Sequence, residues 1–85
     1  MPEMKVGYVK EYFAKVGVAA IEMTEGHLVV GDTIHIKGHT TEFTQRVDSI
    51  QLEHLALQQA EPGQLIGVKV RERVRPHDQV FKVTE

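Results

Sequence analysis

The segment that most constrains the fold is Leu28–Gly38, in which apolar and polar residues alternate around an internal Gly-Asp pair. Its even positions hold four apolar residues that a strand would place on one face: Leu28, Val30, Ile34 and Ile36. Gly31 interrupts the run where the chain must bend, and Gly38 ends it. Short strands with glycine at their corners are typical of a small antiparallel β-barrel. The segment therefore predicts a fold class and leaves the function open.

The rest of the chain divides into further short segments of strand-like composition. Strands are predicted over residues 5–13, 18–23, 28–38, 43–52, 65–74 and 78–83. The alternation changes phase near Ser49 and Ile50, which indicates a β-bulge. Residues 53–60 have room for one helical turn but not for a full helix. We therefore predict an all-β fold, a single closed antiparallel β-barrel of about six or seven strands that occupies residues 1–85 as one domain.

Four residues are predicted to shape the backbone. Gly31 can adopt a positive φ without steric cost, and Asp32 can hydrogen-bond the backbone of the same turn. Gly7 and Gly67 lie inside predicted strands, where the missing side chain lets a neighbouring strand approach closely. These glycines are interpreted as structural features and not as parts of a site.

Side-chain faces follow from the period of two along each strand. In the first strand, Val9 is predicted on the face that carries Gly7, with Val6 on the opposite face. Residues 18–23 are small and apolar on both faces, which suits a crowded interior. Phe13 and Phe43 lie near strand ends and are expected to close the ends of the barrel.

Composition excludes several classes of function. The chain has no cysteine, so disulfides and thiolate chemistry are excluded. No apolar stretch approaches the ~20 residues that cross a bilayer, and the N-terminal residues lack the apolar core of a signal peptide. A cytoplasmic protein without a membrane partner is expected. No glycine-rich phosphate loop is present, so no nucleotide is expected.

The main candidate site is a run of cations near the C-terminus. Lys69, Arg71, Arg73 and Arg75 alternate with valine or glutamate, although the net charge of the whole chain is −2. In a strand, the four cations would share one face over ~20 Å. Such a row would contact phosphates, and Tyr8 would stack on bases. The alternative interpretation is a solvated strand face that discourages edge-to-edge aggregation.

Histidine and serine provide no comparable pattern. The five histidines have no spacing typical of metal ligands, and His35 is expected to face solvent. Ser49 is the only serine, and no local arrangement supplies a base and an orienting group. We predict no catalytic residues, no metal site and no cofactor, and therefore a protein that is not an enzyme.

Four motifs together carry a resemblance to known families. They are Gly7-Tyr8-Val9, Leu28-x-x-Gly31-Asp32-x-Ile34-x-Ile36-x-Gly38, Val47-x-Ser49-Ile50 and Gly63-x-x-Ile66-Gly67-Val68. In order and spacing they resemble domain 2 of the translation GTPases, as in elongation factor Tu, and the short translation elongation factor-like proteins. The chain is also similar to the barrel that follows the catalytic domain in peptidase family U32.

The resemblance implies a non-catalytic binding module with one of two partners. The elongation factor barrel helps to hold aminoacyl-tRNA, which implies contact with transfer RNA or ribosomal RNA. The basic residues and Tyr8 are then the predicted RNA-binding residues. The peptidase barrel implies the alternative, a protein-interaction module that docks on a separate enzyme such as a U32-type peptidase. A third hypothesis is a small-molecule or metal-binding protein that uses the histidines.

Overall fold

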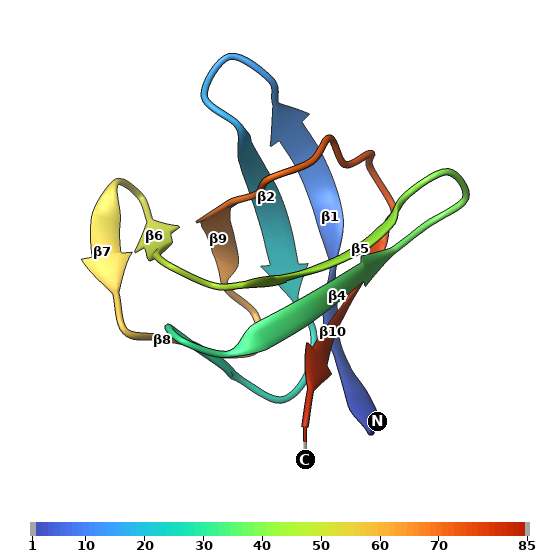
Figure 1. Cartoon of the computed structure of the whole chain (residues 1–85). Helices are drawn as coiled ribbons and strands as arrows, with labels where there is room; N and C mark the ends of the chain where they lie inside the picture. Colours follow the sequence, from blue (N-terminus) through green and yellow to red (C-terminus); the bar gives the residue numbers. More distant parts are fainter. Residues whose placement is uncertain (1, 85) are drawn as a thin grey trace.

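The computed structural model describes residues 2–84, so the two terminal residues of the predicted domain 1–85 lie outside it. The described residues form ten strands and no helix (Figure 1). The strands are β1 (Glu3–Phe13), β2 (Val18–Met23), β3 (Leu28–Val29), β4 (Thr33–Lys37), β5 (Glu42–Arg46), β6 (Ile50–Leu52), β7 (Leu55–Leu57), β8 (Gln59–Ala60), β9 (Leu65–Lys69) and β10 (Gln79–Val83). The all-β prediction is confirmed.

Eight of the strands form one antiparallel sheet in the order β5-β4-β10-β1-β2-β9-β6-β7, and β3 pairs with β8. This order begins at β5 and ends at β7, so in the described part of the chain the ladder does not return to its first strand. The predicted closed barrel is therefore not found. In its place the sheet curves around its core, with β4 and β5 crossing over β1 and β2 (Figure 1).

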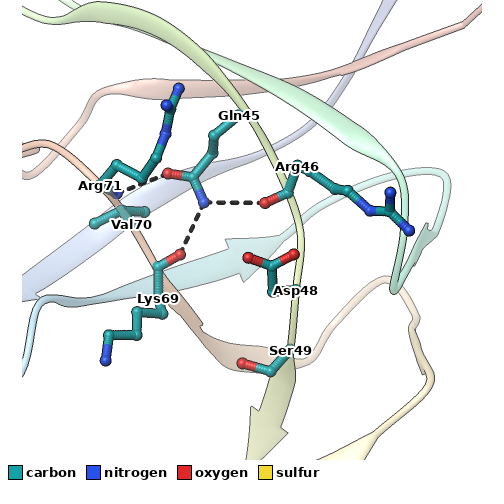
Figure 2. A pocket seen from close by; sticks show the side chains of 7 residues that line it. All are labelled: Gln45, Arg46, Asp48, Ser49, Lys69, Val70 and Arg71. Atoms are coloured by element: carbon teal, nitrogen blue, oxygen red, sulfur yellow. Dashed lines mark hydrogen bonds between the residues drawn. The ribbon is translucent and has the colours of Figure 1, made fainter.

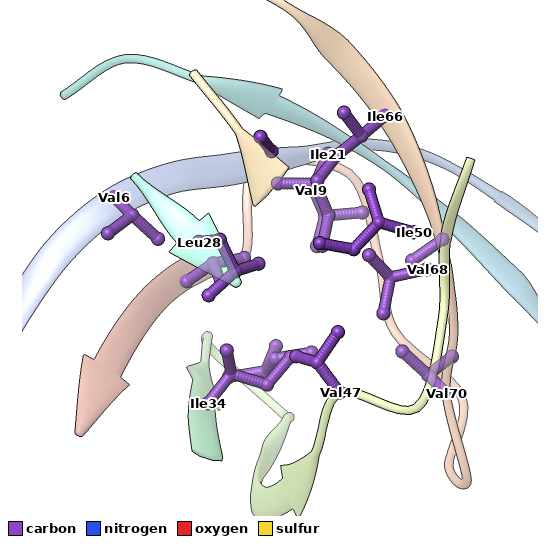
Figure 3. Packing of buried hydrophobic residues seen from close by; sticks show 14 of the residues in the cluster. Val6, Val9, Ile21, Leu28, Ile34, Val47, Ile50, Ile66, Val68 and Val70 are labelled. Atoms are coloured by element: carbon purple, nitrogen blue, oxygen red, sulfur yellow. The ribbon is translucent and has the colours of Figure 1, made fainter. Parts of the chain in front are cut away.

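The core lies between these two parts of the curved sheet (Figure 3). Ile21 and Ile66 come from one part and Ile34 from the other, and each is at most 1% exposed. The alternation predicted for residues 28–38 is confirmed at Leu28, Ile34 and Ile36, which are fully buried. Val30 is only half-buried and packs against the core from the turn between β3 and β4. Burial of this row contributes to the hydrophobic stabilisation of the domain.

Gly31 and Asp32 separate β3 from β4 as the sequence predicts. Gly31 has a φ of +103°, in the region that favours glycine. The backbone N–H of Val29 donates to Asp32 Oδ2 at 2.8 Å. Gly7 lies where β1 and β2 approach each other closely, because a Cβ on Gly7 would overlap the carbonyl oxygen of Glu22 in β2. The predictions for Gly31 and Gly7 are confirmed, and a Cβ on Gly67 would also be crowded, at 3.3 Å from Val18 Cγ1 in β2.

The predicted faces of β1 are wrong at Val6. Val6 and Val9 are both fully buried, although an odd spacing would place them on opposite faces of a regular strand. The pairing register shifts between Lys5 and Gly7 against β10, and again between Val9 and Glu11 against β2. Val6 is the extra residue of the first irregularity, which turns it to the same side as Val9, and Lys10 is the extra residue of the second.

The predicted strand over residues 43–52 is two strands. It breaks between β5 and β6, which lie toward opposite ends of the sheet. The phase change near Ser49 is real, but it marks a crossing and not a bulge. Residues 53–60 also differ from the expected helical turn. Glu53 and His54 have φ values of +51° and +70° and connect β6 to β7 as a two-residue hairpin loop.

Candidate interaction surfaces

The predicted basic strand face does not exist in the structure. β9 ends at Lys69, and the chain continues through bends and turns to residue 78. Val70 is 7% exposed and Val74 is 1% exposed, so the two buried anchors are four residues apart. Arg71, Arg73 and Arg75 are exposed, but they extend from an irregular segment and not from one strand face. The prediction failed because alternating valines are also compatible with a loop anchored at two of them.

The segment after β9 is held to β5 by a side chain (Figure 2). Gln45 Nε2 donates to the carbonyl oxygen of Lys69 at 2.8 Å, and the backbone N–H of Arg71 donates to Gln45 Oε1 at 2.8 Å. Gln45 is only 7% exposed. The Gln45 amide thus makes the two hydrogen bonds that a peptide group of a neighbouring strand would make to this segment. Arg71 Nη2 adds a bond to the carbonyl oxygen of Thr44 at 2.6 Å.

An open groove of about 550 Å³ lies at this junction and includes two of the predicted residues. It is lined by Gln45, Arg46, Asp48, Ser49, Lys69, Val70 and Arg71. The long cationic side chains point in different directions, while the Asp48 carboxylate lies among them (Figure 2). Arg73 and Arg75 are not part of the lining. The groove is therefore not a uniform row of positive charge.

Tyr8 lies far from Lys69. It pairs with Glu22 in β2 and with Gln79 in β10. Lys69 pairs with Val18, which in turn pairs with Phe13 at the far end of β1. Five residues of strand between Tyr8 and Phe13 correspond to roughly 17 Å. The structure therefore separates Tyr8 from Lys69. Arg75 is the predicted cation on the Tyr8 side, because its N–H donates to Asp78 Oδ2 at 2.9 Å and the Asp78 carbonyl oxygen accepts from the N–H of Val9 at 2.7 Å.

A second groove, of about 470 Å³, crosses the outer face of the sheet and was not expected from the sequence. Exposed Phe13 and Leu65, at 45% and 46%, contribute large apolar side chains to it. Ala20 pairs with Gly67 across β2 and β9, so the floor between them carries almost no side chain. The rim is polar and includes Lys10, Glu11, Glu53 and His54.

This outer groove corrects two predictions. Phe13 does not close an end of the fold, whereas Phe43 is 9% exposed and belongs to the core. Residues 18–23 do not all face a crowded interior, because Val18 and Ala20 line the outer groove. The signal in the sequence was the pair of apolar residues Val18 and Ala20 on the face that also carries Glu22, since apolar side chains on an outward face indicate contact with something else.

His35 is also placed differently from the prediction that it faces solvent. Its side chain is 13% exposed and lies between two carboxylates. Nδ1 is 2.8 Å from Glu3 Oε2, and Nε2 is 3.2 Å from Glu42 Oε2. The cluster ties β1 and β5 to β4 on the outside of the sheet. Within residues 2–84, no group of three or more histidine, aspartate or glutamate side chains is arranged to hold a metal ion.

Curated relatives of the chain are proteases, while no family model matches it. It is 40% identical over 78 residues to a collagenase of Porphyromonas gingivalis, and 37% identical over 84 residues to an uncharacterized protease of Methanocaldococcus jannaschii. These matches cover 91% and 98% of this chain but 22% and 20% of the two relatives. The chain thus spans about a fifth of their length.

Solved structures agree with these relatives. The C-terminal domain of a putative U32 peptidase from Geobacillus thermoleovorans aligns with a TM-score of 0.86 and 27% identity, over 96% of this chain and 93% of that domain. The chain is similar to a peptidase C-terminal domain. The selenomethionine variant of the Geobacillus thermoleovorans domain aligns with this chain at a TM-score of 0.84.

These similarities overturn the expected role in translation. The relatives and the structural neighbour are named as proteases or peptidase domains, and the resemblance to elongation factor Tu is not shown. The predicted elongation factor-like and RNA-binding functions are therefore wrong. The residues predicted for RNA binding do not share one strand face: Lys69 and Arg71 line the groove near Gln45, Arg73 and Arg75 lie outside that lining, and Tyr8 belongs to β1.

Proposed function

We propose that this chain is a non-catalytic protein-interaction module that docks on the body of a U32-type peptidase. The similarity to a peptidase C-terminal domain supports the partner, and about four fifths of the length of each relative lies outside the matched segment. A module of this kind would position or stabilise the peptidase, and the peptide-bond chemistry would belong to the larger part.

The outer groove is the observation that carries this proposal. It presents Phe13 and Leu65 beside a floor of Ala20 and Gly67, with charged residues only at the rim. An apolar centre with a polar rim is the usual anatomy of a protein interface. Large exposed apolar side chains around one hollow also favour a protein partner over a solvated surface.

The proposal of a non-catalytic role rests on the surroundings of Ser49. It lines the groove near Gln45 together with Asp48, but no histidine belongs to that lining. A serine nucleophile needs a base within hydrogen-bond reach. Asp48 and Lys69 are the lining side chains that could act as a base, but among the residues drawn in Figure 2 no hydrogen bond joins either of them to Ser49.

Binding to a protease body tests the proposal. The partner is the Porphyromonas gingivalis collagenase without its matched 78-residue segment, hereafter the truncated collagenase, whose folding is checked by circular dichroism. Isothermal titration calorimetry should show saturable binding of this chain. Phe13→Ser should weaken it about tenfold, because roughly 1.4 kcal/mol of apolar burial would be lost.

Val16→Ser is the matched control for this experiment. Val16 is 60% exposed but lies outside the lining of the outer groove, so its loss should leave the affinity unchanged. Absence of binding by the unmodified chain, or equal effects of the two serine variants, would contradict the proposed docking.

A further inference from the structure

We propose that the free edge of β7 adds an extended segment of the peptidase body as an extra strand. This inference rests on the proposed function, since it names the way in which the same partner is held. β7 is the last strand in the sheet order, paired with β6 on one side only. An unpaired strand edge is a template for a strand from another polypeptide.

The hairpin geometry determines which backbone groups face this edge. Glu53 and His54 both have positive φ, so Leu52 and Leu55 flank a tight two-residue loop and exchange hydrogen bonds. Hydrogen-bonded and non-hydrogen-bonded pairs alternate along an antiparallel ladder. The next pair, Gln51 with Ala56, is therefore of the non-hydrogen-bonded kind, and its N–H and C=O groups point outward.

The pairing of β6 with β9 supports this assignment independently. Gln51 pairs with Gly67 of β9, and the Gln51 carbonyl oxygen lies 4.0 Å from the position of a Cβ on Gly67, so it is directed toward β9 and away from β7. By the same alternation, Ala56 directs its N–H and C=O away from β6, toward the free edge. Ala56 is exposed, and within residues 2–84 neither of these groups has a hydrogen-bond partner outside the β6 ladder.

The two edge strands of the sheet, β5 and β7, differ in whether side chains bond to their free backbone groups. At β5, the carbonyl oxygens of Thr44 and Arg46 accept hydrogen bonds from Arg71 and Gln45 side chains, which occupy that edge. No side chain in the described residues occupies the edge of β7 in this way. β3 pairs with β8, and the N–H of Val30 donates to the carbonyl oxygen of Gln58 at 3.0 Å. The chain then turns away at Gly31, which leaves the stretch beside Ala56 open.

The side chains around the β7 edge favour an apolar partner segment, and this edge adjoins the outer groove that is proposed for docking. Leu55 is 69% exposed, the largest value among the exposed large apolar side chains of the described chain. The loop residues Glu53 and His54 form part of the rim of the outer groove. A partner seated on Phe13 and Leu65 would thus meet the β6–β7 hairpin at the rim, where an extended apolar segment can pair with Ala56.

Substitution of Ala56 separates strand addition from simple docking. Ala56→Pro removes the outward N–H and places a ring at the edge, while the β6–β7 ladder loses no donor. It should weaken binding to the truncated collagenase about tenfold. Ala56→Val keeps the N–H and suits a strand, so it should bind like the unmodified chain.

Amide hydrogen exchange on the unmodified chain keeps the inference testable if the proline variant unfolds. The Ala56 amide should exchange quickly in the free chain and at least about tenfold more slowly when the truncated collagenase is bound. If the chain binds but Ala56 is not protected, or the proline and valine variants bind alike, strand addition is wrong and the docking proposal stands. If the chain does not bind at all, both fail.

Discussion

At the scale of single residues, the side chain of Gln45 replaces the backbone hydrogen bonds of a strand pairing. Its amide bonds to the backbone on both sides of Val70, as a neighbouring peptide group would in a sheet. The pattern of the strand places Gln45 between two inward residues, Phe43 and Val47, and all three are buried. A buried polar side chain is tolerated because its bonds are satisfied.

Gln45→Leu should therefore destabilise the fold. Leucine has a similar size but leaves the Lys69 carbonyl and the Arg71 N–H without partners, at a cost of about 2 kcal/mol. For a domain of this size, the melting temperature should fall by about 10 °C. Gln79→Leu is the control, because Gln79 is exposed on β10 and should tolerate leucine within a degree or two. Thermal denaturation curves that coincide for the two variants would contradict this role of Gln45.

At the scale of elements, the loop of the β6–β7 hairpin consists of two residues that disfavour the backbone conformation it adopts. Both loop positions have positive φ, which glutamate and histidine adopt only at an energetic cost. Sequence propensity therefore pointed away from a hairpin and toward a helical turn at residues 53–60. Pairing of β6 with β7 and β9 outweighs that local preference.

Replacing the loop by Asn-Gly should stabilise the protein. Glu53→Asn with His54→Gly supplies residues that adopt positive φ readily, and a gain of about 1 kcal/mol is expected. Urea denaturation should show a higher midpoint with an unchanged slope. The same pair at Glu61 and Pro62, before the turn glycine Gly63, is a control that should bring no gain. A lower midpoint for the loop variant would show that the native pair makes contacts that outweigh its strain.

At the scale of the whole molecule, the apolar face and the cations lie in different places. The outer groove is formed by β1, β2, β9 and the β6–β7 hairpin, whereas the groove near Gln45 lies at the junction of β5 with the segment after β9. The charged residues of the surface proposed for docking, Lys10, Glu11 and Glu53, lie only at its rim. The chain as a whole has a net charge of −2, which gives no general attraction to polyanions.

Docking through the apolar face should be insensitive to salt. The dissociation constant for the truncated collagenase should change less than about twofold when salt rises from about 50 to about 300 mM, since screening acts on charges and not on apolar contacts. Calorimetric titration at the two salt concentrations measures this. A loss of affinity of about tenfold or more would assign the contact to the cations at Lys69 and Arg71, with Arg71→Ala as the variant that checks it.

The amino-acid pattern by itself determined the fold class. The apolar row of Leu28, Ile34 and Ile36 and the corner at Gly31 require short antiparallel strands around a core, because only that arrangement buries one face of each. Local alternation also located most strands to within a few residues. It failed at Val6 because bulges depend on the neighbouring strands and not on the strand itself.

The tertiary structure alone decided where the surfaces are. Phe13, Ala20 and Gly67 come from three strands, and only strand register brings them to one outer groove. Whether Lys69 and its neighbours form a strand face likewise depends on where β9 loses its partner, which alternation cannot show. Sequence patterns report which residues are apolar, and long-range pairing determines which of them the fold covers and which it leaves for a partner.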